Sequence, residues 1–540
     1  MLFSSIFLKL GFLQYSVICI LLAMLLAQGA LAESLPPLPL KEAQKHSINS
    51  SDSELDEVLN GFEQEEKITQ ESTKKETSNE LDAVFEGFDE SKSSSEDLDE
   101  LLDNFDQAPS EQNVSVNQDK QLISSTQKNH HDFSYSGYAA LDLSYNYAHH
   151  KPDNNNPDFR GLSRLRSSLY LELEDRLSEQ ILEGSWKVFA SLTAFYDVAY
   201  AWQGREQYSQ QLLKKYEDEL ELKDTYIQGS LTSNLDLKVG RQIVVWGVAD
   251  NIRINDVLNP LDLREPALAD IEDIRIPVAM TKFDYYFGQW NLSGIIKHER
   301  RFNKIPVFNS EFYPGNQAEP DKIEPSGGIK NSEYGLALKG FFSGWDLSFY
   351  WAHYFENEAH WELNTSSQIK QKYSQLNLYG SSLNFAKKNW LFKTEIAYID
   401  GLKYFALPAG QELSRIDFSI GIEYEGFSDT HIQLEIANRH IRNYDRALDN
   451  SIDDKQKDQI EMALYLQQDY FHDTLHLVVL AQTLGLKSEF GSLQRLSLEY
   501  DINDKLTVKG GVMLYHGGES VWFNHIKNND RLFFNLKYYF

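Results

Sequence analysis

The chain has 540 residues, a formal net charge of −30 and 13% aromatic residues, with 29 Tyr and 31 Phe. Its mean hydropathy of −0.47 excludes a protein built from membrane-spanning helices, and its acidity excludes nucleic acid as a partner, because phosphate binding needs a basic surface. Many aromatic residues at low mean hydropathy are typical of a transmembrane β-barrel, whose lipid-facing and lumen-facing residues alternate along each strand.

Residues 1–32 have the features of an export signal. Lys9 gives a positive start, residues 17–27 are almost wholly apolar, and Ala30, Leu31 and Ala32 form an A-x-A cleavage site. The apolar run is short for a spanning helix, which disfavours the alternative of an uncleaved membrane anchor. The single cysteine, Cys19, lies in this segment, so we expect the mature chain to have no disulfide bond and no cysteine metal site.

Residues 33–130 are predicted to be a disordered acidic arm in the periplasm. Residues 33–110 alone hold 22 Asp and Glu and 6 Lys. Such a segment cannot bury enough apolar surface to offset the entropy lost on ordering. Because the plug of a TonB-dependent receptor is a folded domain, the arm does not resemble one.

Three copies of an LDxxxxxF phrase lie within the arm, at residues 55–62, 81–88 and 98–105. Their apolar residues are spaced to form one face of a two-turn helix, which is too short to be stable alone in water. We therefore predict that the copies dock a periplasmic or inner-membrane partner, such as a transporter, and that tethering raises their combined affinity. The alternative is a solvated spacer with fraying helical turns. The predicted docking residues are Leu55, Phe62, Leu81, Phe88, Leu98 and Phe105.

Residues 131–540 are predicted to form an all-β domain, an antiparallel outer-membrane β-barrel in contact with lipid. The alternation is clear where Ile416, Phe418 and Ile420 share one face while Asp417 and Ser419 share the other. We expect eighteen strands, near residues 133–148, 163–174, 184–202, 221–232, 235–246, 277–288, 290–299, 331–342, 344–354, 374–385, 389–399, 415–425, 429–439, 458–470, 474–484, 492–501, 505–515 and 531–540.

The connections between these segments alternate between short and long. Short turns are expected near residues 233–234, 288–289, 343–344, 471–473 and 502–504. Long loops are expected near residues 149–162, 203–220, 247–276, 300–330, 355–373, 440–457 and 516–530. An even strand count puts both termini on one side of the membrane, which we expect to be the periplasm. The turn near 175–183 fits least well, which keeps sixteen strands as the alternative count.

The last predicted strand ends on an aromatic residue. Leu532, Phe534, Leu536, Tyr538 and Phe540 fall on one face of this segment. The pattern resembles the assembly signal of outer-membrane proteins, so we expect Phe540 and Tyr538 to be read by the barrel assembly machinery.

Four tryptophans lie near the predicted strand ends on the side of the short turns. Tryptophan is enriched at membrane–water interfaces, where its ring is amphipathic. An aromatic girdle is therefore predicted there, formed by Trp186, Trp290, Trp345 and Trp390.

One stretch resembles a known family. GRQIVVWG occupies residues 240–247, NPLDLREP occupies residues 259–266, and Arg275, Ile276 and Pro277 begin the next predicted strand. The pattern is similar to Gram-negative outer-membrane proteins known as domain of unknown function 1302. The resemblance implies a porin-like barrel, often discussed beside resistance-nodulation-division transporters that handle hydrophobic molecules. It implies no catalytic residues.

The long loop after Gly247 carries both signs of charge and is a candidate pore constriction. Such a mixture allows the loop to fold into the lumen, either braced by its own ion pairs or presenting charges to a ligand, and both interpretations stay open here. The residues concerned are Arg241, Arg253, Asp256, Asp262, Arg264 and Arg275.

No catalytic or metal site is predicted. His149 and His150 lack converging ligands, the polar run at residues 153–158 lacks EF-hand spacing, and there is no G-x-S-x-G nucleophile elbow. We therefore expect no enzyme activity and no cofactor. The predicted function is a porin-like channel or transporter for small or hydrophobic molecules. The alternatives are a substrate-specific receptor without a plug, such as one for siderophores, and a structural or adhesive surface barrel.

Overall fold

The computed structural model describes residues 133–540 except 153–156, 178–184, 270, 327–330, 364–367 and 450. The predictions for the signal peptide, the acidic arm and its three repeats concern residues outside these ranges. Among the described residues, no helix is long and apolar enough to cross a bilayer.

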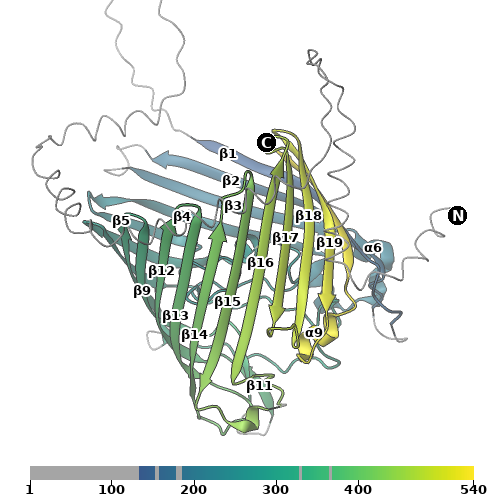
Figure 1. The fold of residues 1–540 in the computed structure, drawn as a ribbon. Coiled ribbons are helices and arrows are strands. Elements are labelled where there is room, and N and C mark those ends of the chain that lie inside the picture. The colour runs from purple at the N-terminus through teal and green to yellow at the C-terminus, as the bar shows by residue number, and fades with distance from the viewer. Residues whose placement is uncertain are drawn as a thin grey trace, which may run out of the picture. The chain divides into compact units, whose positions relative to one another are not determined.

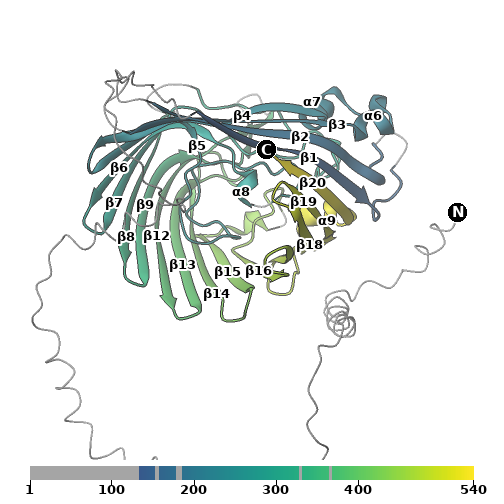
Figure 2. The same ribbon diagram turned by 90° about the horizontal axis from the view of Figure 1, so that it is seen from above.

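Within the described residues, eighteen strands form one closed antiparallel sheet (Figures 1 and 2). Each strand pairs with its neighbour in the chain, and β1 closes the barrel on β20, with Tyr138 opposite Tyr539. The predicted fold class and the count of eighteen strands are therefore confirmed, and the alternative of sixteen is not. Closure gives each of these strands a partner on both sides, as a structure that crosses the hydrocarbon region of a membrane requires.

The strand bounds follow the predicted segments closely. They are β1 Ser134–Asn146, β2 Gly161–Leu177, β3 Trp186–Asp197, β4 Asp218–Thr232, β5 Leu235–Gln242, β6 Val278–Phe287, β7 Trp290–Lys297, β8 Glu333–Phe342, β9 Trp345–Phe355, β12 Gln375–Lys387, β13 Trp390–Leu402, β14 Leu413–Tyr424, β15 Thr430–Arg442, β16 Asp458–Tyr470, β17 Leu475–Leu484, β18 Gly491–Asn503, β19 Leu506–His516 and β20 Arg531–Tyr539.

The wall is apolar outside and polar inside, as a transmembrane barrel requires. On β14, Phe418 and Ile420 are 42% and 48% exposed on the outer face, whereas Asp417 and Ser419 are 0% and 2% exposed on the inner face. On β20, Tyr538 and the adjoining terminal residue Phe540 are exposed on the outer side. The period-two pattern in the sequence thus gives the correct inward and outward faces.

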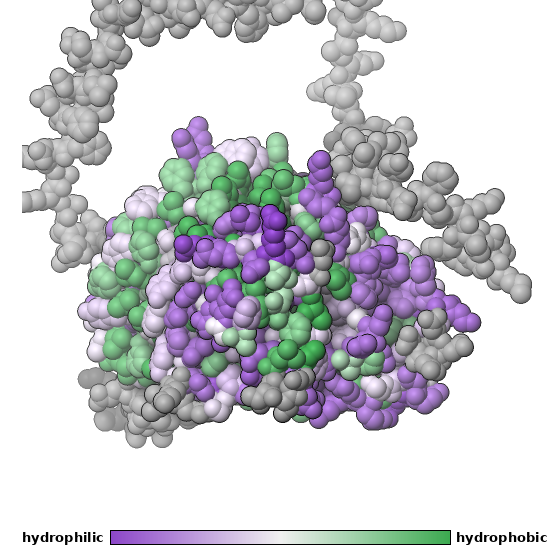
Figure 3. All heavy atoms as spheres, turned by 90° about the horizontal axis from the view of Figure 1, so that it is seen from below, coloured by the Kyte–Doolittle hydropathy of each residue, from purple (hydrophilic) through white to green (hydrophobic). Residues whose placement is uncertain are grey.

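The two rims of the barrel differ in their connections. One rim, here called the turn end, carries the short turns. The start of β1 and the end of β20 also lie there, and the backbone N–H of Gly137 donates to the carbonyl oxygen of Phe540. The other rim, the loop end, carries the long connections, and α9 and β11 lie there in Figure 1. Seen from the loop end, hydrophilic side chains cover much of the surface, with apolar side chains between them (Figure 3).

All four predicted girdle tryptophans are the first residues of their strands at the turn end, and they open β3, β7, β9 and β13. Trp345 and Trp390 are exposed, at 38% and 44%. Trp186 is only 9% exposed because its ring lies over Gly229, where a Cβ would come within 2.4 Å of it.

The structure departs from the predicted elements mainly at the loop end. The segment predicted at 184–202 ends as a strand at Asp197 and continues into helix α6, Ala199–Gln203. The connection near 355–373 contains a small hairpin of β10, His360–Leu363, and β11, Ile369–Lys372. The remaining loop helices are α7 Gln210–Tyr216, α8 Ile271–Ile274 and α9 Val521–Ile526. Strand periodicity gives no indication of these elements.

Candidate functional site

The connection between β5 and β6, residues 243–277, folds into the barrel and is called here the inward loop. Asn259 joins its two limbs. The backbone N–H of Val244 donates to the Asn259 Oδ1 at 2.8 Å, and the Asn259 Nδ2 donates to the carbonyl oxygens of Gln242 (3.2 Å) and Ile276 (2.9 Å). These three hydrogen bonds of Asn259 explain why β5 ends at Gln242, four residues before the predicted end.

A carboxylate on β13 holds the tip of the inward loop. Glu395, which is 3% exposed, accepts from the backbone N–H groups of Val248 (2.5 Å), Ala249 (2.7 Å) and Asn255 (3.0 Å). The Asn255 Nδ2 adds a fourth bond at 2.7 Å. A carboxylate with several converging donors is well satisfied although it is buried.

A second carboxylate, on β15, holds the neighbouring residues in the same way. Glu435 is 1% exposed and accepts from the backbone N–H groups of Asp250 (2.7 Å), Asn251 (3.0 Å) and Ile252 (2.8 Å). Hydrogen bonds to a charged group each contribute ~1.5–3 kcal/mol. The two carboxylates therefore fix the tip of the loop against the wall formed by β13–β15.

Apolar packing fixes the same loop. Trp246 is 2% exposed and stacks on Tyr350 of β9, with ring centroids 5.2 Å apart. A Cβ at Gly335 of β8 would lie 2.9 Å from the Trp246 ring, so this close approach requires glycine. Ile254 and Leu258 complete one buried cluster with the inner wall. The loop is consequently a packed part of the barrel interior.

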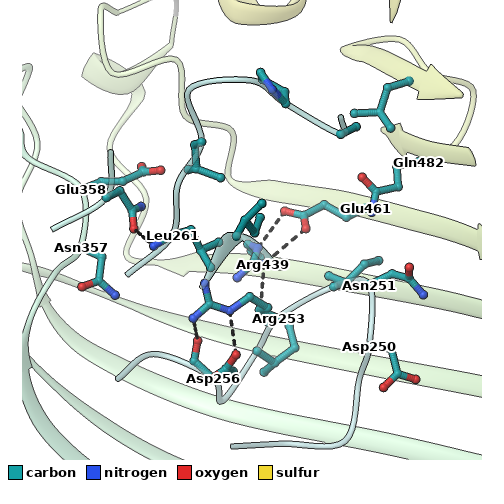
Figure 4. A pocket seen from close by; sticks show the side chains of 18 of the residues that line it. Asp250, Asn251, Arg253, Asp256, Leu261, Asn357, Glu358, Arg439, Glu461 and Gln482 are labelled. Atoms are coloured by element: carbon teal, nitrogen blue, oxygen red, sulfur yellow. Dashed lines mark hydrogen bonds and ion pairs between the residues drawn. The ribbon is translucent and has the colours of Figure 1, made fainter. Parts of the chain in front are cut away.

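Three of the six predicted constriction residues meet in one cluster. Asp256 accepts from the Nε atoms of Arg253 and Arg275, each at 3.0 Å. Arg439 of β15 donates to the carbonyl oxygen of Arg253 at 2.9 Å and to Glu461 of β16 at 2.7 Å, which ties the cluster to the wall (Figure 4).

The other three predicted residues lie apart from this cluster. The Arg264 Nε donates to Asp262 at 2.9 Å, and its Nη2 donates to Glu219 of β4 at 2.6 Å. Arg241 lies on the outward row of β5, because its neighbour Gln242 points inward, and it pairs with Glu299 at 2.5 Å. Each of the six residues is therefore engaged in an ion pair.

Glu265 attaches the inward loop to β2. Its carboxylate pairs with Arg166 at 3.0 Å and with Arg164. Burial alone would raise the pKa of Glu265, but the two guanidinium groups outweigh it and hold that pKa below its usual range. Glu265 therefore stays ionised, and the attachment is insensitive to mild acid.

A cavity of about 970 Å³ lies between the inward loop and the inner wall (Figure 4). Its lining includes His431 near the turn end of β15 and Ile441 near the loop end, so it follows this strand along most of its length. Polar residues such as Gln433 and Gln482 line it beside the apolar Leu480. The inward loop thus narrows the lumen without filling it.

Ion pairs neutralise much of the charge along this cavity. Asp417 of β14 accepts from Arg415 at 2.6 Å and from Arg439 at 3.0 Å, and Arg439 also binds Glu461. Lys393 of β13 pairs with Asp250 at 2.6 Å. The wall therefore offers alternating positive and negative groups.

Glu356 and Glu358 line the cavity just beyond the loop end of β9. Burial and the nearby charge of Glu358 raise the pKa of Glu356 to about 7, against the opposing effect of Arg415 and Lys455. The charge at the loop end of the cavity, here called the cavity mouth, therefore changes near neutral pH.

The sequence did not indicate the residues that dock the loop. Glu395 and Glu435 occupy inward positions of strands, where a polar residue is expected in any barrel. Glu435 is 183 residues away from Ile252, to which it binds. Only the motif asparagine, Asn259, gave a local signal.

The described residues contain no group of three His, Cys, Asp or Glu arranged to hold a metal ion. His149 contacts the carbonyl oxygen of His150 through Nδ1 at 3.0 Å. Of the polar run at 153–158, only residues 157 and 158 are described, and Asp158 pairs with Arg160 at 2.7 Å.

Comparison with solved structures finds matches at low identity. OccAB2 of Acinetobacter baumannii is 9% identical over 76% of this chain and 98% of its own, with a TM-score of 0.45. OccK3 (OpdO) of Pseudomonas aeruginosa is 13% identical over 76% and 96%, with a TM-score of 0.44, and the outer membrane protein opdK of the same species is 10% identical over 75% and 99%, with a TM-score of 0.42. All three scores are below 0.5, so the fold rests on the strand pairing described above.

No curated protein matches the sequence. The model of the family described as "Protein of unknown function (DUF1302)" matches residues 111–540, which include the whole described barrel and the motifs at 240–247 and 259–266. The predicted resemblance is confirmed, and the chain belongs to the DUF1302 family.

Proposed function

We propose that this protein is a porin-like channel of the Gram-negative outer membrane through which small or hydrophobic molecules pass. The observation that carries the proposal is the cavity of about 970 Å³ that follows β15 between the inward loop and the wall. Barrels of 16–18 strands leave an aqueous lumen, and an inward loop sets its width.

The lining of the cavity supports hydrophobic or amphipathic molecules as the class that passes through the channel. Inward positions of a water-filled barrel are normally polar. Here Val478 and Leu480 of β17 and Leu493 of β18 line the cavity, and Trp522 and Phe523 of α9 lie at its loop end. A molecule with apolar parts therefore finds apolar contacts among the polar side chains opposite the inward loop.

The turn end is proposed to face the periplasm. Short periplasmic turns and long extracellular loops are typical of outer-membrane barrels, which supports this orientation. The acidic arm, residues 33–130, then begins on the periplasmic side and docks a partner there through its three repeats. In a pull-down with residues 33–125, changing Phe62, Phe88 and Phe105 to alanine is expected to remove the captured partner. An unchanged captured set would contradict the docking proposal.

Planar-bilayer recording of the purified chain tests the channel. The native protein is expected to conduct, and the double change Glu395→Gln and Glu435→Gln is expected to increase the conductance. Each new amide keeps one acceptor oxygen but replaces the other with an NH2 donor that faces N–H groups of the loop, so the inward loop is held less tightly and leaves the wall.

Glu499→Gln is the matched control, because Glu499 pairs with Lys509 at 3.2 Å on the same inner wall and does not bind the loop. Its conductance is expected to change far less than that of the double variant, because the inward loop stays in place although Lys509 lines the cavity. A native protein that inserts into the bilayer without any conductance would overturn the proposed function.

A further inference from the structure

The rim of the barrel drops abruptly between β4 and β5 at the loop end. β4 pairs with β5 only from Thr225, which lies opposite Arg241. Residues 218–222 of β4 pair with β3 but lie beyond the last residue of β5. The step leaves a notch in the wall, bounded by the edge of β4 and the ends of β5 and β6.

The strands beyond the notch do not fill it, because they end level with β5. Gln242 lies opposite Val278 of β6, and Lys297 of β7 lies opposite Glu333, the first residue of β8. The low part of the rim therefore extends over four neighbouring strands.

The notch is deep enough to reach the apolar band of the membrane. Eight residues of ~3.3 Å each, tilted by ~40°, span about 20 Å along the barrel axis, which is less than the apolar band of ~25 Å. The outer face of β4 beside the notch is apolar, because Leu220 and Leu222 are 72% and 44% exposed. Lipid chains thus lie against the edge of the notch.

Charged side chains close the notch. Lys304 donates to Glu219 at 2.7 Å and to Glu221 at 2.8 Å, and Arg301 also pairs with Glu221. Arg241 donates to the carbonyl oxygen of Leu222 at 3.1 Å. Charges at membrane depth are costly and usually mark a pathway, whereas a permanent seal is more stable with apolar residues.

The inward loop lies directly behind this closure, because the backbone N–H of Lys304 donates to the carbonyl oxygen of Leu261 at 2.9 Å and that of Leu263 donates to the carbonyl oxygen of Lys304 at 2.7 Å. Asn303 and Asp262 line the cavity, and Asn303 directly precedes Lys304. Asp262 binds Arg264, which binds Glu219 on the edge of β4. The segment 299–304 therefore lies between the lumen and the outer leaflet.

We propose that the notch is a lateral portal through which a single-chain amphiphile passes between the cavity and the outer leaflet of the membrane. The segment 299–304 closes the portal, and its ion pairs to Glu219 and Glu221 hold it in the closed position. Leu220 and Leu222 contact the acyl chain. This inference rests on the proposed channel function and adds to it the class of passenger and its route.

Single cysteines placed in the cavity test the portal. In a chain with Cys19→Ser, one variant carries Asn303→Cys beside the notch, and a second carries Gln482→Cys on the far wall of the same cavity. Each is reconstituted in phosphatidylcholine vesicles and exposed either to N-hexadecylmaleimide dissolved in the lipid or to water-soluble methanethiosulfonate ethyltrimethylammonium. Heat-modifiable migration on gels confirms that each variant is a folded barrel.

The lipid-borne reagent is expected to label position 303 and to leave position 482 unlabelled over the same time. Adding Glu219→Gln and Glu221→Gln is expected to speed labelling at 303 by about tenfold, because the partly exposed ion pairs of these carboxylates with Lys304 and Arg301 are lost. The control Glu499→Gln, which removes an ion pair away from the notch, is expected to leave the rate unchanged.

Equal lipid-borne labelling at 303 and 482, or none at 303 even in the Glu219→Gln and Glu221→Gln variant, would overturn the portal. The water-soluble reagent separates this failure from failure of the channel. If it labels both positions, the cavity is open to water and the channel proposal stands without the portal. If it labels neither position, the channel proposal itself fails.

Discussion

The inward loop and the segment that closes the notch are attached to the wall by different chemistry. At the tip of the inward loop, Glu395 and Glu435 bind backbone N–H groups from deeply buried positions. At the notch, Lys304 and Arg301 reach Glu219 and Glu221 through long side chains, and the paired groups are 12–25% exposed.

The difference teaches which part of the pore is fixed and which is able to move. A backbone N–H is already positioned by the chain, so its bond to a carboxylate costs little side-chain entropy. An ion pair between long, partly exposed side chains loses more rotamer entropy and is weakened by salt. The inward loop is therefore expected to be rigid, and the ion pairs that attach the closing segment to β4 are expected to be labile.

The largest expected effect comes from removing an inner anchor. Glu435→Ala leaves three N–H groups of the loop without their acceptor, which costs roughly 3–5 kcal/mol of loop docking. Hydrogen exchange at residues 250–252 is expected to accelerate strongly. Glu499→Ala serves as the control, and slow exchange at 250–252 in the Glu435→Ala variant would show that packing alone holds the loop.

The next effect concerns the packing of Trp246. Gly335→Ala places a Cβ 2.9 Å from the Trp246 ring, and this overpacking is expected to cost about 1–3 kcal/mol. Gly294→Ala on the adjacent strand β7 is the control, because its nearest neighbour would be a Leu336 methyl at 3.8 Å. A shift of Trp246 fluorescence and faster hydrogen exchange of the inward loop in the Gly335→Ala variant only would confirm that the packing of Trp246 keeps the inward loop rigid.

Sequence reasoning succeeded where the membrane imposes a rule at each residue. Phe418 and Ile420 must meet lipid and Asp417 and Ser419 must meet the lumen, so alternation gives both the faces and the strand count. It failed at the end of β5 because Val244 and Trp246 keep the same alternation while packing inside the barrel.

The contacts of the candidate site depend on the closed barrel. Glu435 follows the inward alternation of β15, but its partners lie 183 to 185 residues away, and no local pattern indicates them. The notch is also invisible in the sequence, because it arises from the difference between the ends of β4 and β5. Nothing in the segment 218–224 itself marks a missing neighbour.

Salt is expected to act on the notch and to spare the inner anchors. Raising the ionic strength from ~0.1 M to ~1 M shortens the Debye length from ~10 Å to ~3 Å, and exposed ion pairs contribute only ~0.2–1 kcal/mol each. Hydrogen exchange at residues 301 and 302 is expected to rise severalfold while exchange at 250–252 stays constant. Equal acceleration at both segments would remove the distinction between a fixed loop and a labile closure.

The smallest expected effect is the response of the cavity mouth to pH. Because the pKa of Glu356 is raised to about 7, its carboxyl is neutral at pH 5.5 and carries a negative charge at pH 8.5. The preference of the channel for potassium over chloride is therefore expected to rise with pH, with a midpoint near 7, in reversal-potential measurements. Glu356→Gln is expected to abolish this step. Glu358→Gln is expected to move the midpoint to lower pH, because the like charge that raises the pKa of Glu356 is gone. If the change of ion selectivity with pH persists in Glu356→Gln, the titrating group is another residue and Glu356 does not supply a pH-dependent charge at the loop end.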